Sequence, residues 1–262
     1  AFFGELTAPP RRLKDYPLAL INNKVNLDQL LAIHNAMKNP VTYIQGPPGT
    51  GKTSTIVNII ITAFFNERTV LFASYNNHPI DGVFASLQRL KYKDKLIPFP
   101  ILRLGNGEKL VEAAAYIKKL YHAVKDVPVF EATLDRNKLN KKEQTKALTE
   151  LLKRHEEIIY LNDKSDAIVS MLNLNTNLTF QADLRAGQLH KVQSKLEQIG
   201  SVTDAEALSL LTNDEEAFRK YLYFTSAKYI KRLGEPKYEE LWEILDIQDQ
   251  ETYIKEFNKY LR

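Results

Sequence analysis

The chain has 262 residues, of which 44% are hydrophobic and 26% charged, a composition typical of a soluble globular protein with one large domain or two smaller ones. It contains no cysteine, which excludes a disulfide framework and any site that needs a thiolate as metal ligand or nucleophile. The longest apolar run, at 56–65, is too short to span a bilayer, and no signal-peptide pattern opens the chain. We therefore expect no membrane contact and a cytoplasmic location. The net charge of +4 permits contact with nucleic acid without requiring it.

Glycine and proline are distributed unevenly and suggest a boundary near residue 107. Seven of the ten glycines lie before residue 108, and only two of the eleven prolines lie after it. Frequent turns suit alternating strands and helices, whereas few turns suit long helices. We therefore expect a lead-in segment at 1–25, an α/β half-domain at 26–107 and a mostly helical part at 108–262.

Alternating helices and strands are expected up to residue 107. Apolar, β-branched runs predict four strands, at 18–21, 41–44, 70–73 and 100–104. We expect them to form a parallel sheet in which the second and third strands are buried. Helical patterns predict a helix that Asn26 caps and Asn39-Pro40 ends, and two more at 54–65 and 80–92. The polar loop 74–79 follows the third strand at its carboxyl end, where open α/β sheets bind ligands.

The hydrophobic pattern changes to a heptad-like spacing in the second part. Two stripes show this spacing: Leu148, Leu152, His155 and Ile159, then Leu189, Val192, Leu196 and Ile199. They predict an antiparallel, coiled-coil-like hairpin at about 135–200, in which His155 is a packing residue. Shorter amphipathic helices are expected after 204, with Asp204 and Asp214 as candidate caps.

The stretch from Gly46 to Thr53 has the pattern G-x-x-x-x-G-K-T of a phosphate-binding loop, between an expected strand and an expected helix. Glycines let the backbone turn tightly and bring its N–H groups onto phosphate oxygens. Lys52 is placed to reach the β- and γ-phosphates, and Thr53 to offer its hydroxyl to Mg²⁺. The predicted nucleotide-binding residues of the loop are Gly46, Pro47, Pro48, Gly49, Thr50, Gly51, Lys52, Thr53 and Ser54.

The sequence around the loop resembles superfamily-one helicases of the group that includes the nonsense-mediated-decay helicase, senataxin and the Dna2 nuclease-helicase, rather than AAA+ ATPases, which share the octapeptide. The stretch 26–29, Asn-Leu-Asp-Gln, is similar to the helicase Q motif, and the resemblance implies that the Gln29 amide pairs with adenine. Residues 73–81 resemble motif Ia, which lies along single-stranded nucleic acid in that family. The resemblance thus implies nucleic-acid contacts at Ser74, Asn76, Asn77 and Arg103.

Other interpretations of these side chains are open from the sequence. Gln29 also suits an exposed helix face, and Arg103 an ordinary surface position. Ser74, Asn76 and Asn77 also suit an Asx-type turn. The aromatic residues near 221–229, with lysines between them, are typical of a helix core with solvated lysines rather than of a base-stacking surface.

The resemblance implies a RecA-like parallel sheet with a long helical insertion, ATP and Mg²⁺ as cofactors, and ATP-dependent movement along single-stranded nucleic acid. DNA is favoured over RNA as that strand, although the sequence does not decide between them. The acidic pair of helicase motif II has no clear counterpart, because Asp214-Glu215 suits a capped helix start. We therefore expect catalytic turnover of the parent protein but not of these residues alone. The alternative is an AAA+-type or regulatory nucleotide-binding module whose helical arm recruits a protein partner.

Overall fold

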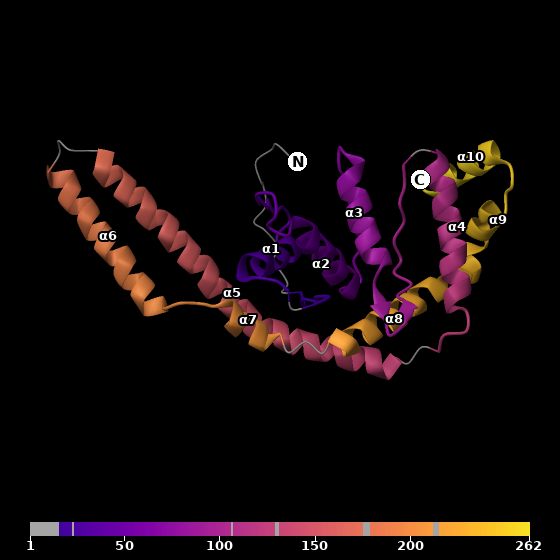
Figure 1. Cartoon of the computed structure of the whole chain (residues 1–262), viewed down its shortest axis with the longest axis horizontal. Helices are drawn as coiled ribbons and strands as arrows, with labels where there is room; N and C mark the ends of the chain where they lie inside the picture. The colour runs from indigo at the N-terminus through magenta and orange to yellow at the C-terminus, as the bar shows by residue number, and fades with distance from the viewer. Residues whose placement is uncertain (1–15, 23, 106, 129–130, 175–178, 212–214) are drawn as a thin grey trace. The chain divides into compact units, whose positions relative to one another are not determined.

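The computed structural model describes residues 16–22, 24–105, 107–128, 131–174, 179–211 and 215–262 (Figure 1). The helices are α1 (Leu27–Lys38), α2 (Lys52–Phe65), α3 (Asn77–Gln88), α4 (Gly107–Val124), α5 (Glu131–Leu174), α6 (Thr179–Ile199), α7 (Asp204–Leu210), α8 (Glu215–Lys231), α9 (Glu239–Leu245) and α10 (Gln250–Tyr260). Two short strands, β1 (Lys91–Tyr92) and β2 (Lys95–Leu96), and two 3₁₀ turns, η1 (Arg232–Gly234) and η2 (Pro236–Tyr238), complete the elements of this described part.

The chain forms two compact units, each made of two segments. Unit 1 comprises 1–68 and 141–213, and unit 2 comprises 69–140 and 214–262. Both units draw residues from each side of residue 107. The division into a half-domain at 26–107 and an insertion at 108–262 therefore stays a prediction.

The core of unit 1 packs α1 against the middle of α5 and against α7. Asn26 caps α1 as expected, in a reciprocal capping box with Gln29. The buried cluster contains Leu18, Leu20, Val25, Leu27, Leu30, Ile33, Leu148, Leu151, Leu152, Ala207 and Leu211. Leu148 and Leu152 were expected in the hairpin seam, and that expectation is wrong. They are buried against α1 because this part of α5 lies beside the α1 face that carries Leu30 and Ile33.

The rest of α5 and α6 run alongside each other in Figure 1, and the hairpin expected at about 135–200 stays a prediction in its bounds. Its seam buries Leu161, Ile168 and Val192, with Leu172, Leu189, Leu196 and Ile199 packed against them. An ion pair joins Lys195 Nζ to Glu157 Oε1 across the seam at 2.6 Å. The second predicted stripe therefore lies in the hairpin seam, and the seam residues on α5 begin at Leu161, 13 residues after the expected start at Leu148.

The expected parallel sheet is not confirmed, and the expected burial of its second and third strands is wrong. Val41 and Tyr43 are 77% and 85% exposed, and Leu71 is 92% exposed. These segments form no ladder, since the ladder of the described residues is the antiparallel pair β1–β2. An extended segment buries its side chains only when neighbouring strands or covering helices are present.

The first expected strand, 18–21, forms no ladder but is buried at 18–20, and side chains take the place of a neighbouring strand. Thr62 Oγ1 accepts a hydrogen bond from Ala19 N at 3.2 Å and donates to Ala19 O at 2.8 Å. Asn58 Oδ1 accepts from Ile21 N at 3.0 Å. Polar residues on α2 thus satisfy a buried backbone that has no ladder.

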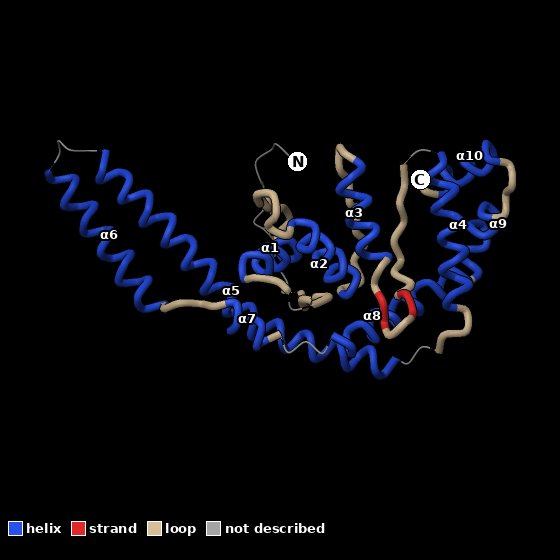
Figure 2. The backbone as a smooth tube through the Cα atoms, in the orientation of Figure 1, coloured by secondary structure: helices blue, strands red, loops and turns tan. Residues whose placement is uncertain are grey.

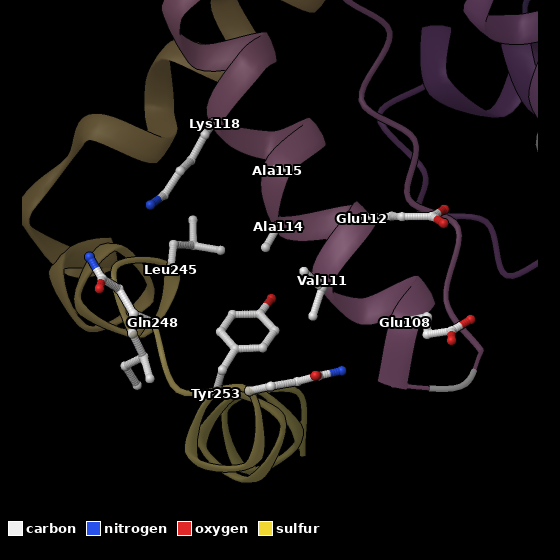
Figure 3. Close-up of a pocket in the computed structure, with 11 residues that line it drawn as sticks. Glu108, Val111, Glu112, Ala114, Ala115, Lys118, Leu245, Gln248 and Tyr253 are labelled. Atoms are coloured by element: carbon white, nitrogen blue, oxygen red, sulfur yellow. The ribbon is translucent and has the colours of Figure 1, made fainter.

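Unit 2 packs α4 against α8, α9 and α10. One cluster, around Ile117, Leu241 and Phe257, joins α4 to the C-terminal helices, and another, around Leu120 and Ile230, joins α4 to α8. A pocket of about 590 Å³ opens between α4 and the C-terminal helices (Figure 3). Burial raises the pKa of Tyr253 in its wall to about 12, and the Tyr253 hydroxyl donates to Leu110 O at 3.2 Å.

Two expected helix ends differ in the structure. The helix expected at 80–92 ends at Gln88, and residues 91–92 form β1 instead. Asp204 was a candidate cap, but Thr203 caps α7, and the Asp204 carboxylate accepts a hydrogen bond from Leu27 N at 2.7 Å. Asp214, the other candidate cap, lies outside the described residues, and α8 begins at Glu215. Among the described helices, none combines the length and apolar character needed to cross a membrane.

Candidate functional site

The phosphate-binding loop lies in unit 1 and leads directly into α2. Gly49 and Gly51 have φ angles of 84° and 77°, in the left-handed region that favours glycine. A Cβ on Gly51 would also lie 2.5 Å from Gln29 Nε2, and a Cβ on Gly46 would lie 2.7 Å from Thr50 Oγ1. Backbone angle and close packing both explain why these positions are glycine.

Lys52 is the first residue of α2, and its side chain folds back over the loop. Its Nζ donates hydrogen bonds to Gly46 O at 2.5 Å and to Pro47 O at 2.8 Å. The ammonium therefore lies inside the curve of the loop, where the backbone turns around it. The carbonyl oxygens of Gly46 and Pro47 are thus the hydrogen-bond acceptors of the ammonium in this structure.

The N-terminus of α2 suits an anion and a cation together. Its first turn has no acidic residue, and its N-cap, Gly51, supplies no side-chain cap. The free N–H groups and the positive end of the helix dipole favour a phosphate there. Thr53 and Ser54 are exposed in the same turn, so the Thr53 hydroxyl is accessible to a Mg²⁺ ion. The described residues hold no cluster of acidic or histidine side chains that would bind a metal alone.

Gln29 lies against the loop, although it comes from α1. Its Nε2 donates to Thr50 O at 2.9 Å, and its Oε1 accepts from Asn26 N at 3.3 Å. The side chain is half-buried rather than free on a helix face. The amide that the Q-motif resemblance assigns to adenine is therefore beside the loop, where it caps α1 and contacts the loop backbone.

The residues expected on nucleic acid lie in unit 2, at the start of α3. Asn76 is the N-cap of α3, and Asn77 is its first residue. Ser74 and Asn76 are exposed, and their side chains make no hydrogen bond with described residues. Their polar groups are therefore accessible to a ligand at the N-terminus of a helix.

Arg103 is partly buried and bonded to its neighbours rather than free on the surface. Its side chain is 14% exposed. Its guanidinium donates to Asp81 Oδ1 at 2.9 Å, Asn77 Oδ1 at 3.0 Å and Leu104 O at 2.9 Å. Arg103 thus holds the first turn of α3 and orients Asn77. The side-chain carbonyl of Asn77 already accepts a hydrogen bond from Arg103.

Two contributors to the site were missed from the sequence. His155 lies 3.0 Å, Nε2 to Oδ1, from Asp28, the neighbour of Gln29 on α1. Asp81 holds Arg103, as described above. Asp81 is the last residue of the stretch that resembles motif Ia and His155 belongs to a heptad stripe, but their partners are distant along the chain. The signal for Asp81 was its place one turn inside the helix after the polar loop, where it faces the N-terminal residues.

A glycine loop, a lysine and a threonine at the N-terminus of a helix define a P-loop nucleotide-binding protein. The family model described as an AAA domain matches residues 24–220, and the chain belongs to this family. With its relatives, the match places the chain in the superfamily-one helicase group and implies an α/β, RecA-like class of fold.

Curated relatives match mainly over a part of the chain. The chain is 32% identical over 111 residues to the mouse DNA-binding protein SMUBP-2, which covers 42% of the chain and 10% of that protein. It is 34% identical over 85 residues to the putative ATP-dependent RNA helicase ECM32 of Saccharomyces cerevisiae, covering 32% of the chain and 8% of that protein. It is 30% identical over 107 residues to the Drosophila melanogaster regulator of nonsense transcripts 1 homolog, covering 37% and 9%.

The chain therefore spans about a tenth of the length of these relatives. No solved structure matches it. The family is established by the model match, while substrates and partners of the whole protein are matters for proposal.

Proposed function

We propose that the chain is the ATP-binding part of an ATP-dependent helicase that moves along single-stranded nucleic acid. The observation that carries the proposal is the loop 46–53, which curves around Lys52 with Gln29 beside it. Membership of the helicase group and the similarity to named helicases support it. The proposal includes a RecA-like parallel sheet, which membership of this family implies.

The residues of the loop have separate roles in this proposal. Lys52 would exchange the carbonyls of Gly46 and Pro47 for β- and γ-phosphate oxygens, because a full negative charge attracts the ammonium more strongly than a carbonyl dipole. Thr53 would bind Mg²⁺, and Gln29 would contact adenine. Bound ATP supplies the phosphoanhydride whose hydrolysis drives movement. The described residues offer no clear motif II, so we expect nucleotide binding without turnover from these 262 residues.

Nucleotide binding is tested by thermal unfolding with and without MgATP. At a ligand concentration one hundred times the dissociation constant, binding should add about 2.7 kcal/mol to the free energy of unfolding. Lys52→Ala should remove most of that gain, since a charge-assisted hydrogen bond contributes about 1.5–3 kcal/mol. Lys24→Ala, at an exposed lysine of unit 1, is the matched control. An unaltered melting temperature at millimolar MgATP would refute nucleotide binding.

The proposed nucleic-acid contacts are Ser74, Asn76 and Asn77, with Arg103 as the residue that positions Asn77. Exposed amide and hydroxyl groups at a helix N-terminus suit phosphate oxygens and read no sequence. We propose single-stranded DNA rather than RNA as the substrate. Names of the relatives include both a DNA-binding protein and an RNA helicase, so binding to matched DNA and RNA oligonucleotides decides between them.

A second candidate function concerns the arm, which we define as 157–199. Tyr160 and Leu184 on the arm are 62% and 59% exposed. Large apolar side chains on an exposed hairpin suit contact with another protein. We propose on this ground that the arm also recruits a protein partner, as a regulatory nucleotide-binding module would do.

A further inference from the structure

The hairpin that β1 and β2 form carries an unusual concentration of positive charge. The stretch 89–96 contains one arginine and three lysines against a single aspartate, Asp94. Arg89, Lys91, Lys93 and Lys95 are all exposed, and no described acidic side chain forms an ion pair with any of them. Exposed basic side chains without ion-pair partners, gathered on one short element, are the charge pattern expected of a phosphate-binding surface.

The hairpin packs on α8, within unit 2. Arg219 Nη1 donates to Lys91 O at 3.1 Å, and Ile97 N donates to Leu90 O at 2.8 Å. The rings of Tyr92 and Tyr223 lie 5.9 Å apart, so Tyr92 anchors the hairpin and does not offer a free face to a base. The basic side chains therefore project from a fixed platform. Counting Arg219 and Lys220 together with Glu215 and Glu216 at the start of α8, the local charge remains +3.

The turn of the hairpin has a lysine at a position whose backbone angle favours glycine. Lys93 has a φ of 53°, in the left-handed region, and it begins the two-residue connection between the paired residues Tyr92 and Lys95. Glycine is favoured at such positions. The Lys93 ammonium lies 5.5 Å from the centre of the Tyr92 ring, which fixes the charge at the tip of the hairpin.

The place of the hairpin in unit 2 relates it to the candidate nucleic-acid residues. Asn76 and Asn77 lie at the N-terminus of α3, and the hairpin follows its C-terminus (Figure 2). With 12 residues, α3 is about 18 Å long. A strand held at Asn76 would need to extend only along this one helix to reach the lysines.

We propose that the hairpin 91–96, with Arg89, is a second nucleic-acid contact that binds the phosphate backbone of the same strand. The inference rests on the proposed action on nucleic acid and adds a surface to it. Phosphate contacts position a strand without reading its sequence, and the absence of a free aromatic face on the hairpin fits that role.

The test measures the affinity of the 262-residue chain for a short, labelled oligo(dT) at several salt concentrations. The variant replaces three lysines together, Lys91→Gln, Lys93→Gln and Lys95→Gln. The matched control replaces three exposed lysines of the same unit, Lys119→Gln, Lys125→Gln and Lys255→Gln. We expect the hairpin variant to lose about tenfold or more in affinity and to flatten the slope of log affinity against log salt by about 2, with a much smaller change in the control.

A single substitution separates the charge from folding. Lys93→Gly should leave the melting temperature unchanged or raise it, because glycine suits the turn, and it should still weaken binding. Equal affinities and slopes for the hairpin variant and its control would overturn the inference, and an acidic protein surface would then account better for the lysines. If Asn76→Ala weakens binding in that case, the proposed function stands without this surface. No binding by the unaltered chain would overturn both.

Discussion

Arg103 fixes the start of α3 with three hydrogen bonds from one guanidinium. A lysine there is not expected to reach all three acceptors, because its compact ammonium lacks the planar fork of the guanidinium. We expect Arg103→Lys to lower the free energy of unfolding by about 1–2 kcal/mol and to weaken oligonucleotide binding through the loss of order at Asn77. The gain in melting temperature with MgATP should be unchanged. Arg232→Lys, at an exposed position, is the control, and equal binding by both variants would contradict the positioning role.

Lys141 carries the clearest expected dependence of stability on pH. Its residue is 8% exposed, and burial lowers the pKa of Lys141 from 10.5 to about 8. Between these two values the unfolded chain holds a proton that the folded chain lacks, so stability rises with pH across the window and is lost as pH falls to 8. The difference amounts to about 3 kcal/mol.

Lys141→Met should remove this rise and stabilise the chain at pH 7, where the folded state otherwise holds a charge in a buried place. Urea unfolding of both chains at pH 7, 8, 9 and 10 gives the comparison. Lys142→Met, at the exposed neighbour, should leave the pH dependence as it is. A parallel rise for Lys141→Met and the unaltered chain would show that the lysine is not the source.

At the scale of the elements, features that depend on neighbouring residues were predictable from the sequence, and features that depend on distant residues were not. The cap of α1 and the glycine positions of the loop were predictable, because a capping box and a tight turn depend on residues a few positions apart. The packing of Leu148 and Leu152 on α1 was not, since the heptad spacing fits two different neighbours. The exposure of 41–44 was also not predictable, because burial of a strand depends on neighbours that its own sequence does not specify.

The two ends of the predicted stripe on α5 should respond differently to truncation. Leu152 is 1% exposed in the core with α1, whereas Ile159 is half-buried. We expect Leu152→Ala to lower the free energy of unfolding by about 2–5 kcal/mol, as for a fully buried leucine. Ile159→Ala should lower it by about 1 kcal/mol. Equal losses, measured by urea unfolding, would contradict the assignment of the two residues to different surroundings.

At the scale of the whole molecule, charge is segregated between the arm and the remainder of the chain. Residues 157–199 contain four lysine or arginine residues and five aspartate or glutamate residues, a net charge of −1. The chain as a whole carries +4, so the other residues together carry +5. A surface with interspersed charges of both signs attracts a polyanion only weakly. The charge distribution therefore favours nucleic-acid contact outside the arm.

Replacing the arm residues 163–189 by a short glycine-serine linker tests this expectation. The core with α1 and α7 is a cluster separate from the arm seam, so we expect it to remain folded. Oligonucleotide affinity and its salt slope should stay close to those of the unaltered chain, because the deleted segment brings no net positive charge. A large fall in affinity with a flatter slope would instead show that the arm binds nucleic acid.

The exposed apolar side chains of the arm are tested separately. The variants Tyr160→Ala and Leu184→Ala keep every charge, and they should reduce capture of a protein partner if these side chains recruit one.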